Sequence, residues 1–156
     1  LGGPSSHARF DLGTFQQLAN LLDRALAENG GCVLATTSRR TPADVVDALR
    51  ARYGHGEGLV WCDEAEGINP YPGLLAWADR IVVSADSVNM VSEACATHAP
   101  VFVFDPASVS GRPRHFLDSL LARGRIRAMD ATLAPFEVQP LRETARVAAL
   151  VRQRLA

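Results

Sequence analysis

The chain has 156 residues, of which 47% are hydrophobic, and its 16 basic and 17 acidic residues leave a formal net charge of −1. This length suits one compact domain, residues 1–156, with a sizeable core. The balanced charge excludes a basic field for nucleic acid, and the absence of lysine excludes a lysine nucleophile or Schiff base.

The apolar pattern predicts short strands that alternate with helices. In chain order we expect the end of a strand at 1–4, a helix at 13–29, a strand at 32–38, a helix from 42 to about 53, a strand at 59–62, a short helix at 74–78, a strand at 80–83, a helix at 87–97, a strand at 101–104, and helices at 114–123 and 141–155. Each strand is a continuous apolar run, which is typical of a strand buried on both faces. The sequence therefore predicts an α/β fold, a Rossmann-like parallel sheet with helices on both faces.

Two of these helices begin with capping signals. Thr41 is a candidate N-cap, with Pro42 at the first helical position and the acidic Asp44 at the third. Before the helix at 87–97, either Asp86 or Ser87 can cap.

The three cysteines, Cys32, Cys62 and Cys95, lie far apart, each in or beside an apolar segment. They predict buried free thiols in a reducing compartment, and the absence of a CxxC motif or a Cys/His cluster indicates no structural metal. No apolar stretch approaches 18 residues and no segment resembles a signal peptide. We expect a cytoplasmic protein of bacterial type, with peripheral membrane association as the alternative.

A parallel sheet of this kind binds its ligand at the carboxyl ends of its strands. The loops expected there are GGPSSH (2–7), TSRRT (37–41), INPYP (68–72), SADS (84–87) and DPASVSGRPRH (105–115). All are rich in glycine, proline, hydroxyl or charged residues. Polar loops are common at any surface, so their composition alone is weak evidence for a site.

The helix at 87–97 has two separate stripes. Val88, Val91 and Cys95 predict a buried face. Asp86 extends a polar stripe that continues through Asn89 and Glu93. A ligand is therefore able to reach one face of this helix while the other packs.

The polar stripe has a functional and a structural interpretation. Glu93 is placed to accept hydrogen bonds from two vicinal sugar hydroxyls, while the first-turn amides of the helix are placed to receive a phosphate. The alternative is that Asp86 or Ser87 only caps the helix and Glu93 is a solvated charge. A carboxylate at Asp86 also repels phosphate, unless it points elsewhere or contacts a sugar or metal ion.

Two basic groups follow predicted strands. Arg39 and Arg40 are placed to pair with phosphate oxygens, although a solvated surface pair explains them equally well. Arg112, Arg114 and His115 form the second group. A lone loop histidine is seldom an acid or base catalyst, so no catalytic role is assigned to His115.

The remaining loops have weaker signals. The turn that contains Gly3 and Ser5 lacks both the GxGxxG spacing and a P-loop lysine, so it either lets a ligand approach the backbone or simply turns the chain. Asn69 and Tyr71 either offer polar groups and a ring to a base or form a turn with the ring packed on the domain. No GxSxG, HExxH or paired-carboxylate motif is present.

Four blocks of sequence carry a family resemblance: GGPSSHARFD, TTSRRTP, NPYPGLLAWADRIVVSADSVNMVSEACATHAPVFVFD and RPRHFLDSLLARG. They resemble the mitochondrial fission family known from the plant elongated-mitochondria protein, whose bacterial relatives are often described as predicted nucleoside-diphosphate-sugar epimerases. Members of that family are about twice this long. The resemblance therefore implies a C-terminal half, with a missing N-terminal domain across a cleft.

More distantly, residues 69–105 resemble the C-terminal domain of GT-B glycosyltransferases, above all the peptidoglycan N-acetylglucosaminyl transferase. That resemblance implies that Glu93 binds the donor ribose, that residues 84–90 hold the diphosphate, and that residues 69–71 meet the base. The glycine-rich turn of many transferases is here Ala85-Asp86-Ser87, and their catalytic bases usually come from the other domain.

These considerations define the predicted site. The substrate-binding residues that we expect are Gly3, Ser5, Ser38, Arg39, Arg40, Asn69, Tyr71, Ser84, Asp86, Ser87, Asn89, Met90, Glu93 and Arg114. No catalytic residue, metal or cofactor is assigned, since the nucleotide-sugar is expected as substrate. The leading hypothesis is a nucleotide-sugar-binding domain that serves glycosyl transfer or epimerisation when joined to its missing half. The rival is a non-catalytic interaction module of a fission-type protein.

Overall fold

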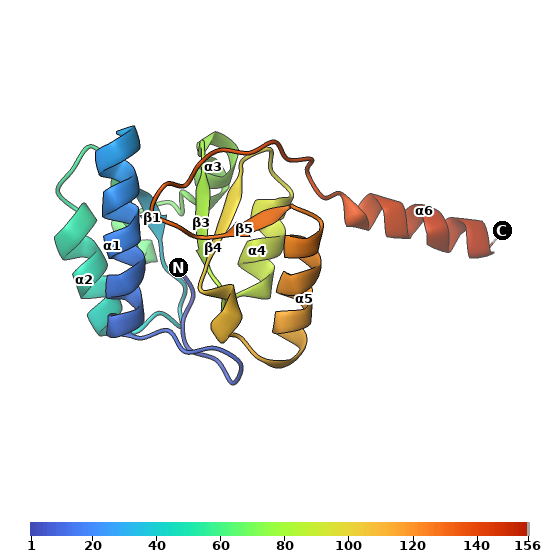
Figure 1. Cartoon of the computed structure of the whole chain (residues 1–156), viewed down its shortest axis with the longest axis horizontal. Helices are drawn as coiled ribbons and strands as arrows, with labels where there is room; N and C mark the ends of the chain where they lie inside the picture. The colour runs from blue at the N-terminus through green and yellow to red at the C-terminus, as the bar shows by residue number, and fades with distance from the viewer. Residues whose placement is uncertain (156) are drawn as a thin grey trace.

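A computed structural model describes residues 1–155 and contains two parallel sheets (Figure 1). In one sheet β1 (Leu34–Thr36) pairs with β2 (Leu59–Trp61). In the other, β4 (Val101–Phe104) lies between β3 (Ile81–Ser84) and β5 (Ile126–Ala128). The predicted mixed α/β architecture with parallel strands is confirmed, but the strands are divided between two sheets.

The helices lie on both faces of the strands, as expected (Figure 1). The larger helices are α1 (Leu12–Asn29), α2 (Ala43–Tyr53), α4 (Val88–Cys95) and α5 (Gly111–Ala122), and the short ones are α3 (Tyr71–Trp77) and the 3₁₀ turns η1 (Glu64–Glu66) and η2 (Pro106–Ser108). A further helix, α6 (Glu143–Leu155), projects away from the domain.

Strand β4 shows how the two faces are built. Its residues are all buried, because both of its faces are covered. Phe102 and Phe104 belong to an apolar cluster with α1 and α2, whereas Val101 and Val103 belong to another with α4 and α5. The alternation of side chains along the strand thus sends successive residues to opposite helix layers.

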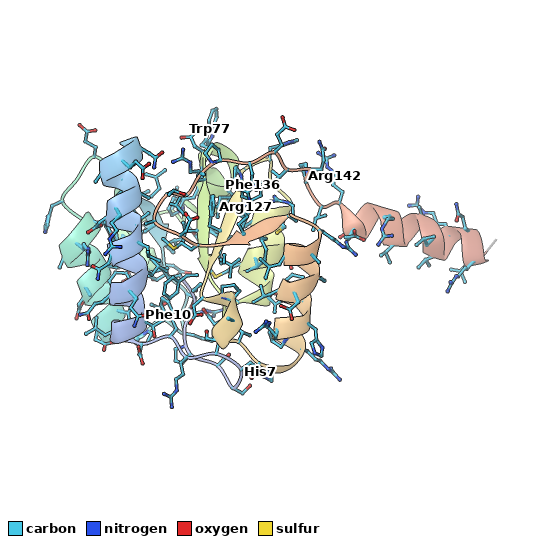
Figure 2. All side chains as sticks on the ribbon, in the orientation of Figure 1. His7, Phe10, Trp77, Arg127, Phe136 and Arg142 are labelled. Carbon is cyan, nitrogen blue, oxygen red and sulfur yellow. The ribbon has the colours of Figure 1, made fainter. Side chains whose placement is uncertain are left out.

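The segment after β5 is anchored by an aromatic contact (Figure 2). The ring of Phe136 meets the ring of Phe102 edge to face, with centroids 5.5 Å apart. The guanidinium of Arg127 lies 4.2 Å from the centroid of the Phe136 ring. These contacts tie the long connection to the central strand β4 and the edge strand β5 before the chain enters α6.

Several sequence expectations need correction. The N-cap position of α2 is Pro42 and no side chain caps it, because Thr41 turns its hydroxyl toward the N-terminal segment, where it donates to the carbonyl oxygens of Leu1 and Gly2. Cys95 is buried and Cys62 half-buried, but Cys32 is exposed because it precedes β1 in the loop after α1. The cysteines are therefore free, as predicted, but not uniformly buried.

Candidate functional site

The glycine turn near the N-terminus meets the turn that follows β3 at the carboxyl edge of the sheets. The backbone N–H of Gly2 donates to Ser84 Oγ over 2.7 Å, and the N–H of Gly3 donates to Asp86 Oδ2 over 2.8 Å. These bonds join residues that are far apart in the chain: Gly2 and Ser84 are 82 positions apart, and Gly3 and Asp86 are 83 positions apart. The expectation that the GGPSSH and SADS loops lie together is confirmed.

The two glycines are required by this close approach. A Cβ atom at position 2 would lie 2.0 Å from Asp86 Oδ2, and one at position 3 would lie 2.0 Å from the carbonyl oxygen of Arg40. Both separations are far shorter than any carbon–oxygen contact in a packed protein. Gly2, which the sequence did not single out, thus approaches the Asp86 carboxylate closely, and Gly3 approaches the backbone of Arg40.

Arg40 joins the third loop to the same turn. Its guanidinium lies 3.1 Å from Asp86 Oδ2 and also donates to the carbonyl oxygens of Gly3 and Pro4, over 3.2 and 3.3 Å. The Asp86 side chain is 1% exposed, whereas that of Arg40 is 47% exposed. About half of the Arg40 side chain therefore remains exposed to solvent.

The carboxylate of Asp86 faces the glycine turn and not the first turn of α4. Its Oδ2 atom accepts from Gly3 and Arg40, while its buried Oδ1 atom has no hydrogen-bond partner among the described residues. The sequence left open whether this carboxylate blocks a phosphate at α4. In the structure its charge is paired with Arg40 and turned away from that position.

Ser87 is the N-cap of α4, which is one of the two alternatives that the sequence offered. Its Oγ atom accepts from the backbone N–H of Met90, and its carbonyl oxygen accepts from Val91. Within residues 1–155 no acceptor is recorded for the N–H groups of Val88 and Asn89. These two donors and the positive end of the helix dipole favour an anion at this position.

The predicted base and ribose contacts lie side by side. Tyr71, at the start of α3, donates its hydroxyl to Glu93 Oε2 of α4 over 2.7 Å. Partial burial and the neighbouring Glu93 carboxylate raise the pKa of Tyr71 well above its usual range, so the phenol stays a donor. Asn69 accepts from the Tyr71 N–H over 2.9 Å, which fixes the loop before α3.

The stripes on α4 agree largely with the prediction. Val91 and Cys95 are buried, while Val88 is only half-buried because it stands at the exposed first turn. Asn89 and Glu93 are exposed.

Other predicted residues have local partners. Ser5 accepts from the N–H groups of His7 and Ala8 within its own loop, and Ser38 accepts from Arg40 N–H. Arg39 is exposed. These contacts shape the loops but do not by themselves indicate a ligand.

Among the described residues, no hydrogen bond or ion pair joins the second basic group to the first. Arg114 lies on α5, where it pairs with Asp118 one turn along and donates to the carbonyl oxygen of Ala107. The loop of His7 packs nearby, since the His7 carbonyl oxygen accepts from Ser110 N–H. Figure 2 shows His7 at this end of the domain and Trp77 at the opposite end.

The family model for mitochondrial fission ELM1 matches residues 1–155. The chain belongs to the mitochondrial fission ELM1 family. It is 34% identical over 160 residues to "Mitochondrial fission protein ELM1" of Arabidopsis thaliana, an alignment that covers 100% of this chain and 37% of the plant protein. No solved structure matches the chain.

The chain is also similar to the "Uncharacterized protein RP120" of Rickettsia prowazekii (strain Madrid E), with 24% identity over 158 residues. That alignment covers 97% of this chain and 44% of the Rickettsia protein. The chain thus spans less than half the length of either curated relative.

Residues 1–155 contain no helix that is long and apolar enough to cross a membrane. In the same residues no three histidine, cysteine or acidic side chains converge as metal ligands.

Proposed function

We propose that this ELM1-family chain is a nucleotide-sugar-binding domain that acts as part of a longer protein. The ligand lies along α4, with its diphosphate at the Val88 and Asn89 amides and its ribose at Glu93. The observation that carries the proposal is the hydrogen bond from the Tyr71 phenol to Glu93 Oε2, which places a phenol and a carboxylate side by side next to that helix.

The spacing along α4 supports this arrangement. Val88 and Glu93 are five residues apart, or about 7.5 Å along a helix axis. The ribose hydroxyls and the diphosphate of a nucleotide are separated by a comparable distance, across the sugar ring and its 5′ carbon. Glu93 Oε1 has no partner recorded among the described residues, so one oxygen remains to accept from a ribose hydroxyl.

The electrostatics at the phosphate position also support the proposal. Asp86 is the acidic residue nearest the start of α4 in the chain, and its charge is buried against Arg40 and the glycine turn. Arg40 thus neutralises the Asp86 carboxylate, which is turned away from the first turn of α4. An anion at the Val88 and Asn89 amides therefore meets backbone donors and not a free carboxylate.

The reaction class follows from the resemblance and from the longer protein. Glycosyl transfer, with nucleotide-sugar epimerisation as the variant, requires catalytic groups on the far side of the bound sugar. We assign those groups to the domain across the cleft, because the phenol and the carboxylate at this site, Tyr71 and Glu93, bind each other and are assigned to the nucleotide.

The second candidate is a non-catalytic interaction module. Membership of the fission family supports it, and so does α6, which carries exposed Val147, Leu150 and Val151 on a projecting helix. Such a module needs no nucleotide, so ligand binding separates the two candidates.

A thermal-shift measurement on the longer protein tests the proposal. With saturating UDP, GDP or ADP, or their sugar conjugates, the preferred nucleotide is expected to raise Tm by about 2–4 °C. Glu93→Ala is expected to lose most of that shift. Glu137→Ala, which removes an exposed glutamate from the segment after β5, is the matched control and keeps the shift.

Two outcomes contradict the proposal at different levels. If no nucleotide stabilises the longer protein, the domain is not a donor site and the interaction module is favoured. If a nucleotide stabilises wild type and Glu93→Ala equally, the ribose role of Glu93 is wrong.

A further inference from the structure

An apolar slot opens between the two sheets. A cavity of about 180 Å³ lies there, lined by β1 residues 34–36 on one side and β3 residues 81–83 on the other. Among residues 1–155 no strand pairs with these facing edges. An unpaired strand edge in the middle of a sheet leaves backbone donors and acceptors without partners.

Leu1 lines this slot, although residues 1–4, where the sequence predicted the end of a strand, form no strand in the structure. Its N–H donates to the carbonyl oxygen of Thr36 over 2.6 Å, and its carbonyl oxygen accepts from the N–H of Ser38 over 2.9 Å. Bonds from one residue to positions j−1 and j+1 of its neighbour are the signature of a parallel ladder. Leu1 is therefore in parallel register with Thr37, on the free edge of β1.

The next residue, Gly2, faces the other side of the slot. Gly2 donates its N–H to Ser84 Oγ at the end of β3. Successive backbone groups of an extended chain point to opposite edges, so a chain that runs into Leu1 has β1 on one side and β3 on the other. At this end the separation of the two sheets is thus the width of one strand.

The walls of the slot specify the chemistry of its occupant. Phe15 and Leu18 of α1 close one face, and Met90 and Ala94 of α4 line the other. A strand between them sends side chains alternately to two apolar layers. It must therefore be a continuous apolar run, rich in branched residues and free of charge.

A charged N-terminal amine is unfavourable at this buried position. Burial lowers the pKa of the Leu1 amino group to about 6, although the nearby Asp86 carboxylate favours the charged form and raises this pKa. An uncharged peptide N–H makes the same hydrogen bond to Thr36 without that cost.

We propose that the residues that lead into Leu1 in the longer chain form a parallel strand that fills this slot and joins the two sheets into one. The relatives have room for it, because this chain covers only 37% and 44% of their lengths. With that strand in place β1 and β3 become interior strands, and the glycine turn at 2–3 becomes the loop at its carboxyl end.

Amide hydrogen exchange in the longer protein tests this assignment. The N–H of Leu59 points toward β1, because it donates to the Val33 carbonyl oxygen. The N–H of the next residue, Val60, therefore points to the outer edge of β2. The exchange rate of Val60 is the internal control. The N–H groups of Leu34, Thr36 and Val82 face the slot by the same alternation. We expect them to exchange ~100-fold more slowly than Val60.

Three results overturn the proposal. Exchange of the slot amides within about threefold of Val60 shows an empty slot. Protection that depends on protein concentration shows a second copy in the slot. A charged residue or proline among the four residues that precede Leu1 excludes those residues as a buried strand. None of these results bears on nucleotide binding at Glu93, so the two proposals fail separately.

Discussion

At the residue scale, Asp86 holds the glycine turn against the end of β3. Its Oδ2 atom accepts from Gly3 N–H and from Arg40, and both partners lose that acceptor in Asp86→Ala. We expect the free energy of unfolding to fall by about 1–3 kcal/mol, measured by denaturant titration. Asp118→Ala, which breaks the more exposed pair with Arg114, is the control and is expected to cost under about 0.5 kcal/mol. Equal losses would show that Asp86 is no more than a surface charge.

The site residues differ in how far the sequence predicts them. Ser87 is predictable as a cap, because its partner Met90 lies three residues away and the pattern is local. The orientation of Asp86 is not, since its partner Gly3 is 83 positions distant. The prediction that Thr41 caps the following helix is wrong for the same reason. Its hydroxyl donates to the carbonyl oxygen of Gly2, which is distant in the chain, and does not cap the helix.

At the scale of elements, α4 is held at its C-terminal end by a buried arginine. Arg125 is 4% exposed, and its guanidinium donates to four carbonyl oxygens, those of Ala94, Cys95, Thr97 and Ala99. A cation at this end also complements the helix dipole. The position of α4, and hence of Glu93, depends on this contact.

Replacing that arginine is therefore expected to destabilise the domain. Arg125→Met keeps the apolar stem but leaves buried carbonyl oxygens unsatisfied, so the free energy of unfolding should fall by about 2–4 kcal/mol. Arg123→Met removes an exposed partner of Glu143 and is expected to change it by less than about 0.5 kcal/mol. A loss for Arg125→Met no larger than for Arg123→Met would contradict the capping role. Urea unfolding measures both.

Strands and helices were predictable where their periodic pattern is strong. Strand 101–104 is found where the pattern placed it, because all of its residues are apolar and buried. Strand β5 was missed because only Ile126 of its three residues is buried, as expected for an edge strand. Helix α3 begins three residues earlier than predicted, since Pro72 is tolerated in a first turn that the sequence had suggested was a loop.

At the scale of the whole molecule, the buried amine of Leu1 couples stability to pH. Its pKa is about 6 in the folded chain and about 8 in the unfolded one, so between these values the unfolded state binds more protons. The free energy of unfolding of the 156-residue chain is expected to rise from pH 6 to pH 8, by at most about 3 kcal/mol. Denaturant titrations at several pH values measure this rise.

N-terminal acetylation isolates the contribution of the amine, because it removes only that titrating group. The acetylated chain should lose the corresponding part of the pH dependence. An identical pH profile with and without the acetyl group would show that the amine is solvated in the folded state.

The overall architecture was predictable, but its division into two sheets was not. Alternating apolar runs and helices indicate a parallel α/β fold, and the carboxyl-edge rule identifies the loops at 2–7 and 84–87 that are in contact. The apolar pattern of the strands does not predict the gap between β1 and β3. The gap depends on which segment of the chain lies beside Leu1 in space.

The proposed ribose contact is tested most directly by calorimetric titration of the longer protein with a nucleoside diphosphate and its 2′-deoxy analogue. For wild type, we expect the ribonucleotide to bind at least about tenfold more tightly, because Glu93 then accepts from the additional hydroxyl. For Glu93→Ala, the two ligands should bind with equal, weaker affinity, which isolates the pairwise contact as in a double-mutant cycle. No binding by UDP, GDP or ADP, or a ribose preference that survives in Glu93→Ala, would contradict the account.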